Sequence, residues 1–132
     1  MTWTPSDMRI LYLEDEAIIA METVEVLKDL GFSNISMAYS LKMAERKLAD
    51  GVPDLALLDI NVSHGRTSFG LGKDLIAQGV PIVFATGYHS ASLPQDMSAV
   101  IIEKPFTAQV LEKALRQAIN RHNDTAAQPE GM

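Results

Sequence analysis

The segment Leu55-Ala-Leu-Leu-Asp59 is an uninterrupted apolar run that ends in a carboxylate. Such runs are typical of strands that have helices over both faces, because neither face then meets water. Four further short apolar runs lie at residues 8–13, 35–39, 81–85 and 100–103. The sequence therefore predicts a sheet of five strands that is covered on both sides.

Amphipathic segments alternate with these strands. Residues 16–30 carry apolar side chains at helical spacing, and Gly31 follows as a favourable residue just beyond a helix end. Ser40 is suited to cap the next helix, and Thr107 is suited to cap the last one. The remaining helices are expected at residues 41–49, at residues 71–77 and from residue 108 onward.

Two segments depart from this regular pattern. Residues 61–70 have the composition of a loop, and residues 88–98 are polar and contain Pro94, so the fourth helix is expected to be short or mobile. Strands that alternate with helices imply parallel pairing with right-handed crossovers. The predicted fold class is α/β, a doubly wound five-stranded parallel sheet of flavodoxin-like order 2-1-3-4-5.

Length and composition limit the function. The chain has 132 residues, no cysteine and a formal net charge of −6. An acidic surface repels phosphate backbones, so we expect no nucleic-acid partner. No segment is apolar for long enough to span a bilayer, so we expect a cytoplasmic protein without a membrane partner. We expect residues 1–7 to form an arm, residues 8–121 the domain and residues 122–132 a disordered tail, with no separate output domain.

Polar side chains gather where the predicted strands end. Glu14 and Asp15 follow the first strand, and Asp59, Thr86 and Lys104 end the third, fourth and fifth strands. In the predicted strand order these ends converge, and ligands bind outside the carboxyl ends of such strands. Clustered carboxylates without His or Cys favour Mg²⁺. A carboxylate such as Asp59 can attack phosphorus and form an aspartyl phosphate.

Four motifs resemble the successive signatures of receiver domains of bacterial two-component response regulators. They are Ile10-Leu-Tyr-Leu-Glu-Asp-Glu16, Leu57-Leu-Asp-Ile-Asn61, Phe84-Ala-Thr-Gly-Tyr88 and Glu103-Lys-Pro-Phe106, in the family's order and spacing. Each motif alone is weak, but the four together cover nearly the whole chain. Phe84-Ala-Thr-Gly-Tyr88 resembles the FAT GUY subgroup, whose members are often single-domain and often partnered by HWE-type histidine kinases.

The resemblance implies a role for each matching residue. Asp59 matches the phosphoacceptor, Thr86 the switch hydroxyl and Lys104 the site lysine. Glu14 and Asp15 match the acidic pair that holds Mg²⁺ with Asp59, and Asn61 stands where family members offer a backbone carbonyl to the metal.

The resemblance also implies a cis Lys104–Pro105 bond, and it has one notable departure. Many receivers carry an inward-turning aromatic residue three positions before the lysine, where this chain has Ile101. Tyr88, two positions past Thr86, is a candidate to replace it or to tune hydrolysis.

The resulting hypothesis is a signalling switch that a histidine kinase phosphorylates on Asp59 in the presence of Mg²⁺. The protein would act by contact with a downstream protein or as a phosphate sink, and it would be an enzyme only toward its own phosphorylation and dephosphorylation. A phosphorylation-independent adaptor is one alternative. A phosphatase of the haloacid-dehalogenase type is another, because residues 59–62 faintly resemble its nucleophile motif. A flavin-binding module is the third, although Glu14-Asp-Glu16 is acidic where a flavin phosphate needs Ser, Thr or Gly.

Overall fold

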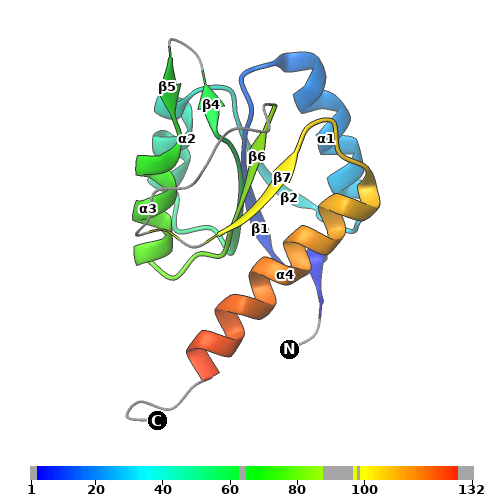
Figure 1. Ribbon diagram of the computed structural model, residues 1–132, viewed down its shortest axis with the longest axis vertical. Coiled ribbons are helices and arrows are strands. Elements are labelled where there is room, and N and C mark those ends of the chain that lie inside the picture. Colours follow the sequence, from blue (N-terminus) through cyan, green and yellow to red (C-terminus); the bar gives the residue numbers. More distant parts are fainter. Residues whose placement is uncertain (1–2, 63–64, 88–96, 98, 128–132) are drawn as a thin grey trace.

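The computed structural model describes residues 3–62, 65–87, 97 and 99–127. Its centre is a five-stranded parallel sheet of order β2-β1-β3-β6-β7 (Figure 1). The strands are β1 (Arg9–Leu13), β2 (Asn34–Ala38), β3 (Leu55–Asp59), β6 (Ile82–Thr86) and β7 (Val100–Glu103). Counted along the chain these five strands have the order 2-1-3-4-5, so the predicted topology is confirmed.

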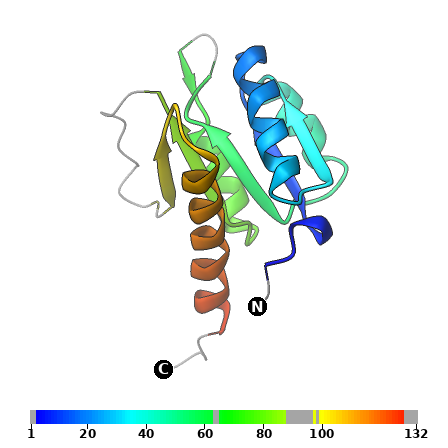
Figure 2. The same cartoon turned by 90° about the vertical axis from the view of Figure 1, so that its right-hand side faces the viewer.

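Helices cover both faces of the sheet, as the apolar run of β3 predicted. Leu55 and Leu57 pack in one core with α1 (Ala17–Asp29) and α4 (Ala108–Ala127). Ala56 and Leu58 pack in the other with α2 (Leu41–Leu48) and α3 (Phe69–Ala77). Successive residues of a strand point to opposite faces of the sheet, so the side chains of this run are buried on both faces. Figure 2 shows α1 and α4 in front of the sheet and α2 and α3 behind it.

Both predicted helix caps are present. The Ser40 hydroxyl accepts a hydrogen bond from the backbone N–H of Met43 at 3.1 Å, and the Thr107 hydroxyl accepts one from Val110 at 3.1 Å. Each bond satisfies an N–H group that the first turn of a helix cannot pair internally. These short hydroxyl residues therefore define where α2 and α4 begin.

Two expectations about secondary structure were wrong. The loop predicted at residues 61–70 contains the antiparallel strands β4 (Asn61–Val62) and β5 (Arg66–Thr67), and α3 already starts at Phe69. The last helix extends to Ala127, so the tail does not begin at residue 122. Residues 122–125 are polar, but residues 122–127 contain neither Gly nor Pro, and polarity alone does not end a helix. The predicted fourth helix lies almost entirely outside the described residues.

The amino-terminal arm packs against the domain. It contains the short helix η1 (Pro5–Asp7), in which Pro5 is buried. The Trp3 ring meets Phe32 edge-on with 5.8 Å between ring centroids, and the Arg116 guanidinium lies 4.6 Å from the centre of the Trp3 ring. The arm therefore connects the α1–β2 turn with α4. None of the described helices has an apolar stretch of the length that a membrane crossing needs.

Arg9 organises the amino-terminal end of the sheet. Its guanidinium donates hydrogen bonds to the Ser36 hydroxyl at 2.9 Å, the Gly51 carbonyl at 2.8 Å and the Lys47 carbonyl at 2.7 Å. Its backbone N–H donates to the Asp54 carboxylate at 2.8 Å. One side chain thus joins β1 to β2, to the end of α2 and to the loop before β3.

Candidate functional site

The carboxyl ends of four neighbouring strands bring the predicted polar residues together. Glu14 follows β1, Asp59 ends β3, Thr86 ends β6 and Lys104 follows β7. Glu14, Asp59 and Thr86 are only 1%, 4% and 2% exposed. Charged side chains are rarely buried to this degree unless they are paired. The burial of two carboxylates therefore marks this end of the sheet as unusual.

Lys104 is the cation that pairs with these carboxylates. Its Nζ lies 2.9 Å from Glu14 Oε1 and 3.3 Å from Asp59 Oδ1. Its backbone N–H donates to the carbonyl of Thr86 at 2.7 Å, which holds the start of the β7–α4 loop against the end of β6. The Lys104–Pro105 peptide bond is cis, as predicted.

Among the residues that the structure describes, this cluster holds three carboxylates and the ammonium of Lys104. Glu14, Asp15 and Asp59 each offer a carboxylate oxygen, and these oxygens lie within 4.8 Å of one another. Lys104 neutralises one of the three charges. An all-oxygen set of this kind, with excess negative charge and no His or Cys, fits a hard divalent cation such as Mg²⁺.

The ionisation of the site reflects this crowding. Burial raises the pKa of Asp59 to about 7, and the charge of Glu14 adds to the effect while Lys104 opposes it. Burial alone would lower the pKa of Lys104, but the hydrogen bond to Glu14 and the charges of Asp59 and Glu14 outweigh it, so the pKa is raised. A cation or a positively polarised group beside Asp59 would favour its charged form.

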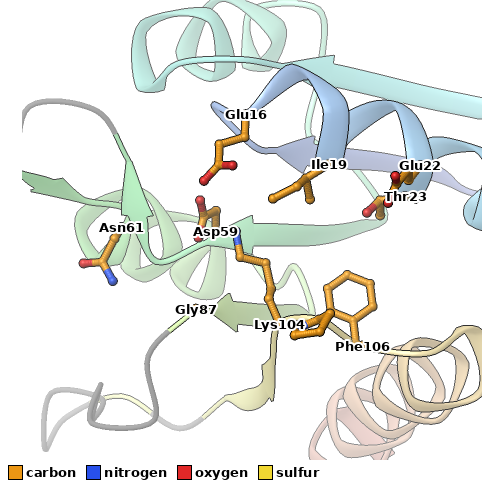
Figure 3. A pocket seen from close by; sticks show the side chains of 10 residues that line it. Glu16, Ile19, Glu22, Thr23, Asp59, Asn61, Gly87, Lys104 and Phe106 are labelled. Carbon is orange, nitrogen blue, oxygen red and sulfur yellow. Dashed lines mark ion pairs between the residues drawn. The ribbon is translucent and has the colours of Figure 1, made fainter.

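A pocket of about 400 Å³ opens beside Asp59. Figure 3 shows α1 on one side of it, with Glu16, Ile19, Glu22 and Thr23, and Lys104 with Phe106 on the other. Asn61 and Gly87 complete the end next to Asp59. The pocket leaves open space beside the Asp59 carboxylate in which a small group can be positioned.

The remaining predicted residues are placed as follows. Asn61 starts β4, is exposed and lines the pocket, while its role as a carbonyl ligand stays a prediction. Ile101 lies on β7, half-buried against the core that contains Phe84. Tyr88 lies outside the described residues.

The sequence reasoning missed two hydroxyl contacts around the site. Ser68 is fully buried, and its hydroxyl donates to the Asp59 carbonyl at 2.6 Å, which ties the start of α3 to the end of β3. Tyr12 on β1 shares a side-chain hydrogen bond with Thr23 on α1, and burial and the charges of Glu14 and Asp59 raise the pKa of its phenol. Ser68 lies in the segment predicted as a loop, shortly before the helix predicted at residues 71–77, and a Ser in that place suggests at most a helix cap.

The chain is similar in sequence to a known regulator. The chain is 30% identical over 114 residues to the phyllosphere-induced regulator PhyR of Methylorubrum extorquens, and the match covers 83% of this chain and 43% of that protein. The chain therefore spans less than half of PhyR. No family model matches the chain.

Solved structures agree. The solution structure of SdrG from Sphingomonas melonis Fr1 is 32% identical with a TM-score of 0.73, and the match covers 84% of this chain and 95% of that one. The response-regulator REC domain of Erythrobacter litoralis PhyR is 26% identical with a TM-score of 0.76, and the match covers 95% and 96%. The fold, the order of the strands and these similarities lead to one conclusion. The chain belongs to the receiver domains of two-component response regulators.

Proposed function

We propose that this receiver domain is a phosphoacceptor switch and that Asp59 takes its phosphoryl group from a histidine kinase. The observation that carries the proposal is the position of Asp59. It is a buried carboxylate at the wall of an open pocket, with Lys104 at 3.3 Å and two further carboxylates close enough to share a cation. A purely structural carboxylate would not need this open pocket.

We propose Mg²⁺ as the metal of this site. Glu14, Asp15 and Asp59 would hold it with the backbone carbonyl of Asn61, and water would complete the coordination. When bound, the ion would neutralise charge on the phosphoryl oxygens. The excess of carboxylates over cations supports this proposal, because the cluster is less repulsive with the ion than without it.

The chain's own residues would act by position and charge, as is usual in phosphoryl transfer. An oxygen of Asp59 attacks the phosphorus, the bond from phosphorus to the donor nitrogen breaks, and its electron pair leaves with the imidazole. The Lys104 ammonium would stabilise the charge on a phosphoryl oxygen, and the Thr86 hydroxyl would donate a hydrogen bond to another. The domain would thus assist only its own phosphorylation and dephosphorylation.

The output would follow from a shift between two conformations. A phosphoryl group that engages Thr86 and Lys104 pulls on the ends of β6 and β7, where Ile101 and Tyr88 would tune the response. We propose that the changed surface contacts a downstream protein in the cytoplasm, or that the chain competes for phosphoryl groups as a phosphate sink. The motif at residues 84–88 supports a place in the FAT GUY subgroup and an HWE-type kinase as partner.

The test is the mass of the intact protein after incubation with Mg²⁺ and phosphoramidate or acetyl phosphate. We expect a gain of one phosphoryl group that requires Mg²⁺ and is absent in Asp59→Asn. A wild-type protein that gains no phosphoryl group from these donors or from candidate kinases, and binds no Mg²⁺, would point to a phosphorylation-independent adaptor. Turnover of a small phosphate ester without a labelled protein would instead favour a phosphatase.

A further inference from the structure

The pocket beside Asp59 has a mixed chemical character that the proposed phosphotransfer does not by itself explain. Ile19, Pro105 and Phe106 supply apolar surface, while Glu16 and Glu22 supply two carboxylates from the same side of the pocket. Both glutamates are exposed, so they face water and any entering molecule. Figure 3 shows the carboxylate of Glu16 turned toward Asp59 and Glu22 farther along α1, beside Thr23.

The geometry of phosphoryl transfer determines what enters this space. The attacking oxygen and the leaving atom lie roughly in line on opposite sides of phosphorus. Because Asp59 stands at the wall of the pocket, the leaving group must project away from it into the open volume. That volume lies between α1 and the Lys104–Phe106 segment (Figure 3). Among the described residues that line it, Lys104 is the one cation, and Glu14 and Asp59 already engage it.

We infer that Glu16 and Glu22 make this pocket selective for phosphodonors whose leaving group is a protonated nitrogen base, and that they disfavour donors whose leaving group is a carboxylate. This inference rests on the proposed function of Asp59 and adds the class of donor.

The physical reason is the charge on the departing group. In an N-phosphorylated imidazolium or in phosphoramidate, the leaving nitrogen starts with positive charge, and the P–N electron pair turns it into a neutral base. In an acyl phosphate, the P–O electron pair leaves with a carboxylate that gains a full negative charge. Glu16 and Glu22 line the space into which the leaving group projects, so their charges favour the first kind of leaving group over the second. The apolar surface of Ile19 and Phe106 suits a flat ring better than a hydrated anion.

The experiment compares two small donors, phosphoramidate and acetyl phosphate. The second-order rate constant for Asp59 phosphorylation is measured with each donor at constant ionic strength and saturating Mg²⁺, in the wild type, Glu16→Gln, Glu22→Gln and the double variant. Glu45→Gln removes one exposed negative charge from α2, away from the pocket, and corrects for net charge. Because Glu22 is not part of the proposed metal site, its variant separates donor selectivity from metal binding.

We expect the ratio of the acetyl phosphate to the phosphoramidate rate constant to rise about threefold in each single variant and about tenfold in the double variant, as charges screened by water and salt allow. Glu45→Gln should leave the ratio unchanged. Ratios that stay at the wild-type value, or that rise equally in Glu45→Gln, overturn the inference while phosphorylation itself persists. Phosphorylation by neither donor overturns the proposed function, and the inference with it.

Discussion

The two ends of the sheet handle charge in opposite ways. At the amino-terminal end, the Arg9 guanidinium donates to the Ser36 hydroxyl and to two carbonyls, so its charge is satisfied by neutral partners. At the carboxyl-terminal end, the ammonium of Lys104 pairs with Glu14 and Asp59, and Asp15 offers a third carboxylate oxygen within 4.8 Å of theirs. The first arrangement is complete as it stands and serves stability. The second holds three carboxylates beside one described ammonium, a charge balance that a divalent cation would offset.

This difference explains why function lies at one end. Parallel strands place the start of every helix near their carboxyl ends, where free backbone N–H groups and loops surround a ligand. Buried charge that is not fully compensated is costly, and proteins concentrate it at functional sites. At the amino-terminal end, the three hydrogen bonds of the Arg9 guanidinium join structural elements.

The largest expected effect concerns stability at the amino-terminal end. Arg9→Met removes three side-chain hydrogen bonds from a charged donor. The Lys47 carbonyl keeps the bond from the Asp50 N–H, whereas the Gly51 carbonyl loses the bond from Arg9. We expect the free energy of unfolding, measured by urea titration, to fall by about 3 kcal/mol. The phosphorylation rate of the folded variant should equal that of the wild type.

The matched control is Arg46→Met, which changes an exposed arginine on α2. It should cost less than about 0.5 kcal/mol, as surface substitutions usually do. If Arg9→Met slowed phosphorylation without unfolding the protein, the two ends would be coupled and the comparison would fail.

The second effect lies at the carboxyl-terminal end, where we expect a substitution, Asp59→Asn, to raise the free energy of unfolding instead of lowering it. The pKa of Asp59 is raised to about 7 in the folded protein, so folding favours the protonated acid. Its stabilising contribution is complete below the unfolded pKa of about 4 and is lost as the pH rises through 7. This rise in the pKa corresponds to about 4 kcal/mol, but the pocket beside Asp59 lets water screen the carboxylate. Without Mg²⁺, we therefore expect wild-type stability to fall by about 2 kcal/mol relative to Asp59→Asn between pH 4 and pH 8.

Urea titrations of both proteins at pH 4, 6 and 8 in EDTA would measure this difference. Excess Mg²⁺ at pH 8 should reduce it, because the cation compensates the carboxylates. Asp54→Asn is the matched variant at the other end, where the carboxylate accepts from the Arg9 N–H, and it should bring no gain in stability. Equal pH profiles of stability for the wild type and Asp59→Asn would show that burial and the neighbouring carboxylates do not raise the pKa of Asp59.

The smallest expected effect concerns Tyr12, a buried residue of β1, and its hydrogen bond and pKa. Tyr12→Phe removes the hydrogen bond with Thr23 and should lower the free energy of unfolding by about 1 kcal/mol at pH 8. The pKa of this phenol is raised above 10, so its contribution is complete below pH 10 and is lost at higher pH. The wild type should therefore lose its advantage over the Phe variant above pH 10.

Urea titration of both proteins at pH 8 and pH 10.5 separates the contribution of the hydrogen bond from that of the raised pKa. A wild-type advantage that persists at pH 10.5 would mean that burial and the charges of Glu14 and Asp59 do not raise the pKa of Tyr12. The same proteins should phosphorylate at similar rates, because the Tyr12 hydroxyl does not reach the phosphoryl group in the proposed mechanism.

The sequence by itself determined the sheet and the location of the site. The apolar run of β3 must be covered on both faces, and the polar residues at the strand ends must meet at one edge once the strands are parallel. These are local patterns and topological rules, so they can be derived residue by residue. The same reasoning failed for the end of α4, because no glycine or proline marks it.

Only the tertiary structure decided which partners these polar residues have. Lys104 meets Glu14 across 90 positions, Arg9 meets Lys47 across 38, and Ser68 holds the Asp59 carbonyl from the start of α3. Such contacts depend on how helices and loops pack on the sheet, which no local pattern encodes. The charge balance at each end of the sheet is the sum of these contacts, and so it appears only when the chain is folded.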